Sequence, residues 1–533
     1  MFNAESQLLF LLLIASLVGM GARRLKLPYT VALVVAGIAL GWMHLDELKG
    51  LHLTPDILML GLLPALLFEA AYHIDFGKLR RDLPVVIFLA IFGVLGATAI
   101  TGFGVYYLFQ AMGVEGFSLG HALLFGSMIA ATDPISVLAL FKTLGVTKRL
   151  YLMVEGESLL NDGVAVVLFL IIAAVLGIST GHGHAPHLEG MGEIINYGLR
   201  TFVVMGVGGV LIGGCVGAVA SLLVKQIDDK LIETALTVVV AYGSFLMAEH
   251  FHTSGVLSTV TAGVVLGTFG KKFGMQVRTR VAVEDFWEFM AFFSNTFVFL
   301  LVGLELDMPQ LMATMGLIVT AWAVVLLARA AMVYLSLPVG RLLGVATVPK
   351  AWAHIMVWGG LRGSLSMVLI IGLPQDFVAR ELLLNLIFGV VSISLLFQAM
   401  TVKPLLARLG LSSNRGERLA YEEARARVIM KHAALDFVKG RGVHMDEGIR
   451  ATLIAEYTTS LENAESAVKE AAGDHLDEEQ LDEERLHLIH IEEEALKHAQ
   501  HEGIVSSTPA RTIMEELAEQ RESIGDHGVG DDA

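Results

Sequence analysis

Cysteine and charged residues are scarce in this 533-residue sequence. The single cysteine, Cys215, has no second cysteine to pair with, so neither a disulfide framework nor a thiolate metal cluster is available for redox chemistry. Charged residues make up 17% of the chain, and hydrophobic residues make up 55%. A soluble globular protein is ordinarily about one-quarter charged and cannot bury that much apolar surface. The composition therefore predicts an all-α polytopic membrane protein.

Apolar stretches long enough to cross about 30 Å of hydrocarbon recur through the first 408 residues. No basic residue precedes the first of them and no small-residue cleavage signal follows it, which predicts a retained span rather than a signal peptide. The pattern predicts about thirteen transmembrane helices. We expect them near residues 6–22, 28–44, 55–73, 83–110, 118–142, 150–177, 195–225, 231–249, 254–270, 284–304, 311–336, 350–372 and 381–408.

Basic residues collect in every second connecting segment, as the count of thirteen spans predicts. Positive charge collects in the cytoplasmic loops of membrane proteins. The segments after odd-numbered spans hold Arg23, Arg24 and Lys26, then Lys78, Arg80 and Arg81, then Lys142, Lys148 and Arg149, then Lys225 and Lys230, then Lys271, Lys272, Arg278 and Arg280, then Arg341 and Lys350. Even-numbered loops hold little beyond Lys49, Arg200 and Arg380. The alternation predicts an odd number of spans, with the N-terminus outside and the C-terminus in the cytoplasm.

The composition becomes polar after about residue 410. Residues 410–533 contain 28 acidic and 13 basic side chains, so they carry nearly all of the net charge of −16. The sequence thus predicts a transmembrane domain over residues 1–409 and an acidic cytoplasmic tail over 410–533, partly helical and disordered at its end. The tail is interpreted as solvated helices, with a regulatory or assembly role as the alternative. No binding partner for the tail follows from its sequence.

Ionisable side chains inside the apolar spans are the strongest functional signal. Each costs at least about 2.5–3.5 kcal/mol to insert, so each needs a partner or a use. The obvious buried cations are Arg329 in the eleventh span and Arg362 in the twelfth. Five carboxylates are expected to lie well inside the membrane: Glu69, Asp133, Glu155, Glu157 and Asp162. This imbalance predicts that a mobile cation or a proton supplies missing positive charge.

Asp133 and Pro134 lie side by side in the fifth span. Pro134 has no N–H to donate and its ring displaces the carbonyl of Ala130, so the helix must open there. Freed backbone carbonyls beside a carboxylate are ligands for a monovalent cation when they line a cavity inside the protein. The structural alternative is a proline kink with a hydrogen-bonded aspartate.

Polar residues in the sixth span fall on two adjacent faces of one helix. Ser158 and Asp162 are four residues apart and share one face, while Glu157 and Asn161 share a face turned by about 100° from it. The first face offers oxygen ligands. On the second face, Glu157 is predicted to hold a buried arginine, with Arg362 as the natural candidate.

The twelfth span is also expected to be interrupted. Gly359, Gly360 and Gly363 surround Arg362 there, and close helix packing is the alternative reason for such glycines. The fifth and twelfth spans are seven apart, an odd number, so they run in opposite directions. This spacing is typical of inverted repeats, in which two broken helices cross at an ion site near the membrane midplane.

Five segments resemble those of the monovalent cation/proton antiporters, a family that includes bacterial and archaeal sodium/proton antiporters and animal sodium/proton exchangers. In chain order they are LLFEAAYHID, ATDPISVLALF, GESLLNDGVAVVLF, HTSGVLSTVTAG and WGGLRGSLS. The resemblance covers residues 6 to 408. It implies a homodimer in the lipid bilayer, in which each copy has a scaffold domain of spans 1–3 and 7–10 and a moving core domain of spans 4–6 and 11–13.

The resemblance also implies roles for single residues. Asp162 resembles the cation- and proton-binding aspartate of the family, and Asn161 resembles the asparagine that accompanies electroneutral exchange in relatives. Further ligands, the ion pair and the helix breaks are implied at the following residues: Asp133, Thr132 through its main chain, Ser158 and Glu69 as ligands, Glu157 with Arg362 as the structural ion pair, and Pro134, Gly359, Gly360 and Gly363 as breaks. Ala65 departs from the pattern, because many relatives have a second proline there.

A carboxylate site holds either a dehydrated cation or a proton, since binding one removes the charge that attracts the other. We therefore predict a multi-pass protein of the inner cell membrane that exchanges Na+ or Li+ for protons at Asp162, with no enzymatic activity, no cofactor, no nucleic-acid partner and no metal beyond the transported cation. Potassium/proton exchange is the alternative substrate reading, and a cation channel is a further alternative. An intramembrane hydrolase is disfavoured, because the spans contain no Gly-x-Gly-Asp or Gly-x-Ser-x-Gly motif. His182, His184 and His187 in an expected outer loop are interpreted as solvated rather than as metal ligands.

Overall fold

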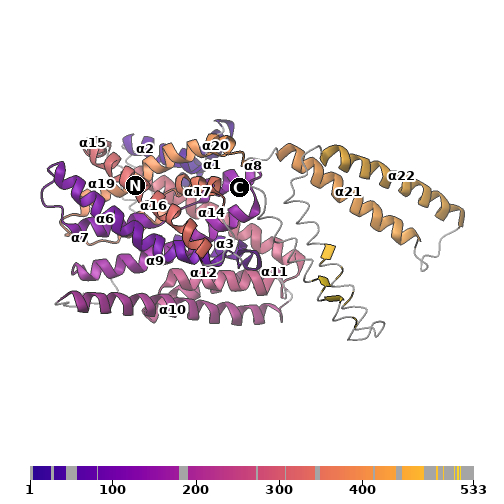
Figure 1. Ribbon diagram of the computed structural model, residues 1–533, viewed down its shortest axis with the longest axis horizontal. Helices are drawn as coiled ribbons and strands as arrows, with labels where there is room; N and C mark the ends of the chain where they lie inside the picture. The colour runs from indigo at the N-terminus through magenta and orange to yellow at the C-terminus, as the bar shows by residue number, and fades with distance from the viewer. Residues whose placement is uncertain are drawn as a thin grey trace. The chain divides into compact units, whose positions relative to one another are not determined.

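The computed structural model of the chain is helical throughout the part that it describes, which comprises residues 4–25, 29–43, 57–80, 82–178, 190–227, 229–271, 274–305, 308–342, 348–411, 415–439 and 447–472 and isolated positions between 488 and 517 (Figure 1). No strand occurs in these ranges. The chain divides into two compact units, one of residues 1–142 and 146–411 and one of residues 143–145 and 412–533. The histidine-rich segment 182–187 and the acidic end of the tail lie outside the described ranges.

Helices of the first unit occur in each of the thirteen ranges expected from the sequence. They are α1 (Ala4–Leu25), α2 (Tyr29–Trp42), η2 (Ile57–Leu62), α3 (Leu63–His73), α4 (Phe76–Leu79), α5 (Leu83–Phe88), η3 (Leu89–Gly93), α6 (Val94–Ala111), α7 (Leu119–Ala130), α8 (Ile135–Leu144), α9 (Lys148–Val175), α10 (Met191–Val224), α11 (Lys230–His250), α12 (Gly255–Val265), η4 (Leu266–Gly270), α14 (Val277–Glu305), α15 (Met308–Ala313), α16 (Met315–Leu342), α17 (Lys350–Trp358), α18 (Ser364–Ile371), α19 (Arg380–Ile393), η5 (Ser394–Gln398) and α20 (Ala399–Arg408). Within the described ranges, seven helical stretches are long and apolar enough to cross a membrane, and four shorter apolar helices accompany them.

Two of the expected spans are divided into half-helices. Backbone between α7 and α8 is non-helical over residues 131–134, and backbone between α17 and α18 is non-helical after Gly359. Pro134 explains the first gap, because it cannot donate a hydrogen bond within a helix. The N–H of Asp133 donates to the carbonyl of Leu361 at 2.8 Å, so the two non-helical segments lie against one another.

A buried aromatic cluster holds α3, α10, α11, α12 and α14 together. Phe68 and Trp287 are its centre, with ring centroids 4.6 Å apart. The indole N–H of Trp287 donates to the Thr237 hydroxyl at 2.8 Å, so its polar atom is satisfied inside the apolar core. In Figure 1, α10 runs along one edge of the first unit beside α11 and α12. Leu199, Leu211 and Leu222 of α10 are exposed, as expected of side chains that face lipid.

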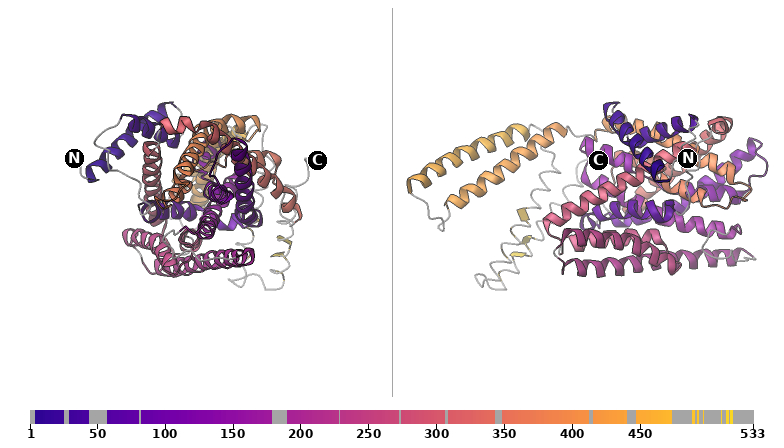
Figure 2. Two further views of the ribbon diagram at one scale, coloured as in Figure 1. Left: turned by 90° about the vertical axis from the view of Figure 1, so that its left-hand side faces the viewer. Right: turned by 180° about the vertical axis from the view of Figure 1, so that it is seen from behind.

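The tail unit contains a helical hairpin. Its two helices are α21 (Arg415–Lys439) and α22 (Glu447–Ala472), which pack against each other (Figure 2). The guanidinium of Arg450 on α22 donates to the carbonyls of Val438 and Lys439 at 3.1 and 2.8 Å, and these bonds cap the C-terminal end of α21. The Lys431 ammonium lies 4.9 Å from the centroid of the Tyr457 ring. The tail hairpin therefore has its own stabilising contacts.

Close approach of α2 and α14 depends on two glycines and leads to a first prediction. A Cβ added at Gly303 would lie 2.8 Å from the Cα of Gly37, where no side chain fits. We expect Gly303→Ala to force the two helices apart at a cost of about 1–3 kcal/mol, seen as a lower midpoint of thermal unfolding in detergent. Gly206→Ala on α10 is the matched control, because a Cβ there meets nothing within 4 Å. Equal midpoints for the two variants would contradict the packing argument.

Candidate ion-binding site

Arg362 holds the C-terminal end of α7. Its side chain is 3% exposed, and its Nη1 donates to the carbonyl of Ala130 at 2.8 Å and to that of Ala131 at 3.2 Å. These carbonyls lose their helical partners where α7 ends. The positive charge of Arg362 also opposes the negative end of the helix dipole. Its own N–H donates to the Ser394 hydroxyl at 3.1 Å, so both the main chain and the side chain of Arg362 are fixed.

The next residue of the non-helical segment, Thr132, is held by α9. The Ser158 hydroxyl donates to the Thr132 carbonyl, and the Asn161 amide donates to the Thr132 hydroxyl at 3.1 Å. All three residues are buried. The structure therefore brings Thr132 of the fifth span together with Ser158 and Asn161 of the sixth span.

Asp133 lies at the N-terminal ends of two half-helices. Its Oδ1 accepts from the N–H of Ile135 at 3.0 Å, at the start of α8. A Cβ added at Gly363, the residue before α18, would overlap the Asp133 carboxyl, so only glycine permits this approach. Negative charge is favoured at helix N-termini. The second oxygen, Oδ2, is buried and has no hydrogen-bond partner in the described structure.

Asp162 extends the set of unpartnered oxygens. Its Oδ1 and the Oδ1 of Asn161 are buried without hydrogen-bond partners in the described ranges. The carboxylates of Asp133 and Glu157 act electrostatically on Asp162. A buried polar atom left unpaired costs about 1–3 kcal/mol, and more when it is charged. Asp133 Oδ2, Asp162 Oδ1 and Asn161 Oδ1 are thus the atoms that a cation or a proton would satisfy.

The ion pair of Glu157 differs from the sequence prediction. Both Glu157 oxygens accept from Arg329, at 2.6 Å from Nη1 and 2.6 Å from Nη2. Arg329 also donates from Nε and Nη2 to the carbonyl of Met356 in the last turn of α17, at 3.2 Å each. The predicted pair of Glu157 with Arg362 is therefore wrong, because Arg362 is taken up by the end of α7. The sequence contains two arginines expected to be buried, and the prediction chose Arg362 although the sequence does not show which of them faces Glu157.

Glu69, which was predicted as a ligand, lies among other charged residues than Asp133 and Asp162 do. Its side chain is 26% exposed, and its Oε1 is 3.4 Å from the Nδ1 of His73. The charges that act on it come from His73, Lys142 and Glu288. Glu69 also acts on Glu155, which lies two helical turns before Asp162 on α9. These electrostatic interactions and the packing of α3 against α9 group Glu69 with Glu155 rather than with Asp133.

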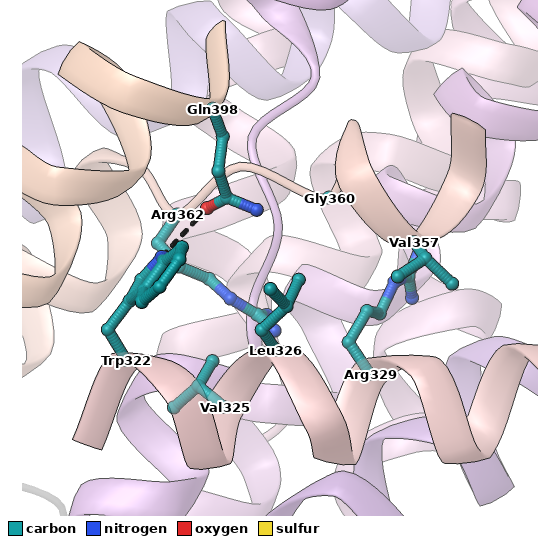
Figure 3. Close-up of a pocket in the computed structure, with 8 residues that line it drawn as sticks. All are labelled: Trp322, Val325, Leu326, Arg329, Val357, Gly360, Arg362 and Gln398. Atoms are coloured by element: carbon teal, nitrogen blue, oxygen red, sulfur yellow. Dashed lines mark hydrogen bonds between the residues drawn. The ribbon is translucent and has the colours of Figure 1, made fainter. Parts of the chain in front are cut away.

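A small cavity lies beside the two arginines. Figure 3 shows both arginine side chains on its wall together with Trp322, whose indole N–H donates to Gln398 Oε1 at 3.2 Å. The remaining lining residues are Val325, Leu326, Val357 and Gly360. A cavity lined by two guanidinium groups and no carboxylate repels cations, so it is not the ion-binding site.

The Glu157–Arg329 pair generates a stability prediction. Removing one partner of a buried ion pair costs about 3–5 kcal/mol, because the other charge stays buried and unpaired. We expect Arg329→Met to lower the unfolding midpoint strongly, and Glu157→Gln/Arg329→Met to be less destabilised than the sum of the single variants. Glu157→Gln/Arg362→Met is the matched double variant, and its two losses should add. Coupling to Arg362 as strong as coupling to Arg329 would overturn the assignment.

Comparison with known proteins agrees with this geometry. The family model described as "Sodium/hydrogen exchanger, transmembrane" matches residues 9–408. The Na(+)/H(+) antiporter NhaG of Bacillus atrophaeus is 35% identical over 522 residues, which are 96% of this chain and 94% of that protein. The Na(+)/H(+) antiporter NhaH of Halobacillus aidingensis is 37% identical over 413 residues, which are 76% of this chain and 98% of that protein.

Among solved structures, the sodium proton antiporter MjNhaP1 from Methanocaldococcus jannaschii at pH 8 has the same fold. The superposition has a TM-score of 0.60 at 18% sequence identity and covers 77% of this chain and 99% of that one. The family match extends over most of the chain, and all site residues lie within it. The chain therefore belongs to the transmembrane sodium/hydrogen exchanger family of multi-pass membrane proteins.

Proposed function

We propose that this protein is a secondary antiporter that exchanges Na+ for protons across the cell membrane. The names of its relatives support sodium and protons as the exchanged ions. The observation that carries the proposal is the pair of half-buried carboxylates, Asp133 and Asp162, each of which has a buried oxygen without a hydrogen-bond partner in the described ranges, beside an interrupted helix.

The proposed ligands come from both sides of the interruption. Asp162 and Ser158 contribute from α9, and Asp133 and the main-chain carbonyl of Thr132 contribute from the segment before α8. Carboxylate, hydroxyl and carbonyl oxygens suit a small hard cation, and freed carbonyls of broken helices coordinate Na+ in transporters of this kind. Asn161 fixes Thr132 through its amide and presents its unpartnered Oδ1 to the same region.

The charges around the site set the stoichiometry that we propose. Two buried arginines, Arg329 and Arg362, accompany three carboxylates, the buried Glu157 and the half-buried Asp133 and Asp162, which leaves one negative charge in excess. Glu157 and Arg329 neutralise each other directly. One monovalent cation or one proton therefore balances the site, and either one excludes the other. This balance supports a one-for-one, electroneutral exchange.

Coupling follows from the cost of moving uncompensated charge through an apolar barrier. An empty site carries its excess charge, and exposing it to hydrocarbon costs several kcal/mol. A site loaded with Na+ or with a proton carries no excess and moves freely between the two sides. Because only loaded forms cross, each Na+ that moves one way is matched by a proton that moves the other way, without ATP.

The membrane arrangement that we propose has thirteen crossings, an outer N-terminus and a cytoplasmic C-terminus. The divided spans α7–α8 and α17–α18 cross near the midplane, and the contact between Asp133 and Leu361 supports that crossing. The aromatic cluster of α3, α10, α11, α12 and α14 supports a scaffold domain separate from the core that holds Asp162. We further propose that scaffold domains pair in a homodimer.

The central test is cation-driven proton movement in proteoliposomes, with Na+, Li+ and K+ added separately. We expect Na+ to drive proton movement in the wild type, and Asp162→Asn to reduce it to the level of protein-free liposomes, because the exchanging charge is gone. Asp376→Asn, in an exposed turn, is the matched control and should exchange normally. Exchange by Asp162→Asn would make that residue structural. Exchange driven by K+ alone would show that K+, rather than Na+, is the transported cation.

The proposed stoichiometry has its own test. We expect the initial rate of Na+-driven proton movement to stay the same when an inside-negative or inside-positive potential is imposed with K+ and valinomycin, since no net charge crosses per cycle. Asn161→Asp adds one carboxylate to the site and is expected to make the rate depend on the potential. A wild-type rate that changes with the sign of the potential would contradict one-for-one exchange.

A further inference from the structure

A second group of oxygen ligands lies on the ligand-bearing face of α9. Glu155 is seven residues before Asp162, which places it about 10 Å nearer the start of the helix and within about 20° of the same face. Ser158 lies between them on that face. The Glu155 side chain is 5% exposed. Its Oε1 accepts from the Tyr151 hydroxyl at 3.2 Å, while its Oε2 is buried without a hydrogen-bond partner in the described ranges.

Glu69 is the second carboxylate of this group, and it lies on a neighbouring helix. α3 packs against α9, and Glu69 is the charged group with the largest effect on Glu155. Glu69 is 26% exposed, so the two carboxylates link a buried position to a more accessible one. Lys142, whose ammonium lies 5.7 Å from the centroid of the Tyr151 ring, is the cation that acts on both. Within the described ranges, the basic groups that act on the two carboxylates are Lys142 and the imidazole of His73, which lies 3.4 Å from Glu69. Lys142 alone among them carries a permanent charge, so it does not balance both carboxylates.

We propose that Glu155 and Glu69 form a second monovalent-cation site, at which Na+ binds before it passes along α9 to Asp133 and Asp162. This inference rests on the antiporter function proposed above. The chemistry of the group is that of a weak cation site, with carboxylate and phenolic oxygens and a buried acceptor that has no hydrogen-bond partner in the described ranges. The single imidazole beside it, that of His73, does not make it a transition-metal site. Lys142 moderates the attraction, so that a bound ion is released rather than trapped.

The position of the group along the helix agrees with this role. α9 begins at Lys148, and Glu155 and Asp162 follow at about 10 and 20 Å from that end. Lys142, whose ammonium lies over the Tyr151 ring, is at the same end of α9. A cation that arrives from that side meets the partly exposed Glu69 first, then Glu155, and then Ser158 and Asp162. The acidic pair raises the local cation concentration in front of the central site.

Direct binding of radiolabelled Na+ to the purified full-length protein separates the two sites. We expect the wild type to bind more Na+ than Asp162→Asn, and Asp162→Asn to keep a residual, weaker component. Adding Glu155→Gln to Asp162→Asn should remove that component. Adding Glu288→Gln, an exposed glutamate that also acts on Glu69, should leave it in place. No residual component in Asp162→Asn, or one that survives Glu155→Gln, would overturn the second site.

Transport kinetics separate this inference from the antiporter function itself. We expect Glu155→Gln to raise the apparent KM for Na+ by about 3- to 10-fold, as lost electrostatic focusing does, while the rate at saturating Na+ stays within about twofold. A loss of maximal rate without a change in KM would place Glu155 in the exchange step and would contradict the proposal. A wild type that exchanges no cation would refute the antiporter function, while the binding measurement would still decide whether Glu155 holds Na+.

Discussion

The structure of the site depends on one constraint, which is that a helix interrupted inside an apolar protein must find partners for its freed backbone groups. Pro134 forces the interruption. Arg362 then supplies donors to Ala130 and Ala131, Ser158 supplies one to Thr132, and Asp133 takes the N–H at the start of α8. The side chains of Arg362, Ser158 and Asp133 are each held in place by the backbone group that they bind. The oxygens that remain unpartnered are therefore held in defined positions before any ion arrives.

The second buried arginine, Arg329, stabilises the other interrupted span, α17–α18, in the same way. Arg329 donates to the Met356 carbonyl near the end of α17, as Arg362 does at the end of α7. A helix end and one carboxylate, Glu157, share the charge of Arg329. The N-terminal ends of α8 and α18 meet at Asp133. Both cations are thus bound to helix ends. Within the part of the chain that the structure describes, Asp162 therefore has no fixed positive partner, and its charge is available to an ion.

The sequence predicted those features that follow from local chemistry. The helical class of the described residues, the membrane location and the family were confirmed. The shared helix face of Ser158 and Asp162 followed from their spacing of four residues alone. The ion-pair partner of Glu157 could not be predicted in this way, because two arginines were available and the choice depends on how α16 and α17 are rotated. Glu155 was recognised only as a buried charge. Its seven-residue spacing from Asp162, which places both on one face, was the signal that would have linked them.

Placing two cation sites on one rigid helix has a consequence for direction. In the proposed division, α9 belongs to the moving core and α3 to the scaffold, so Glu155 travels with Asp162 while Glu69 stays behind. The Glu69–Glu155 pair then exists only when the core faces one side of the membrane, in the state in which α3 packs against this part of α9. Na+ gains an extra site of attraction on that side alone. Exchange can still run both ways, as thermodynamics requires, but the apparent affinity for Na+ is expected to be higher on that side.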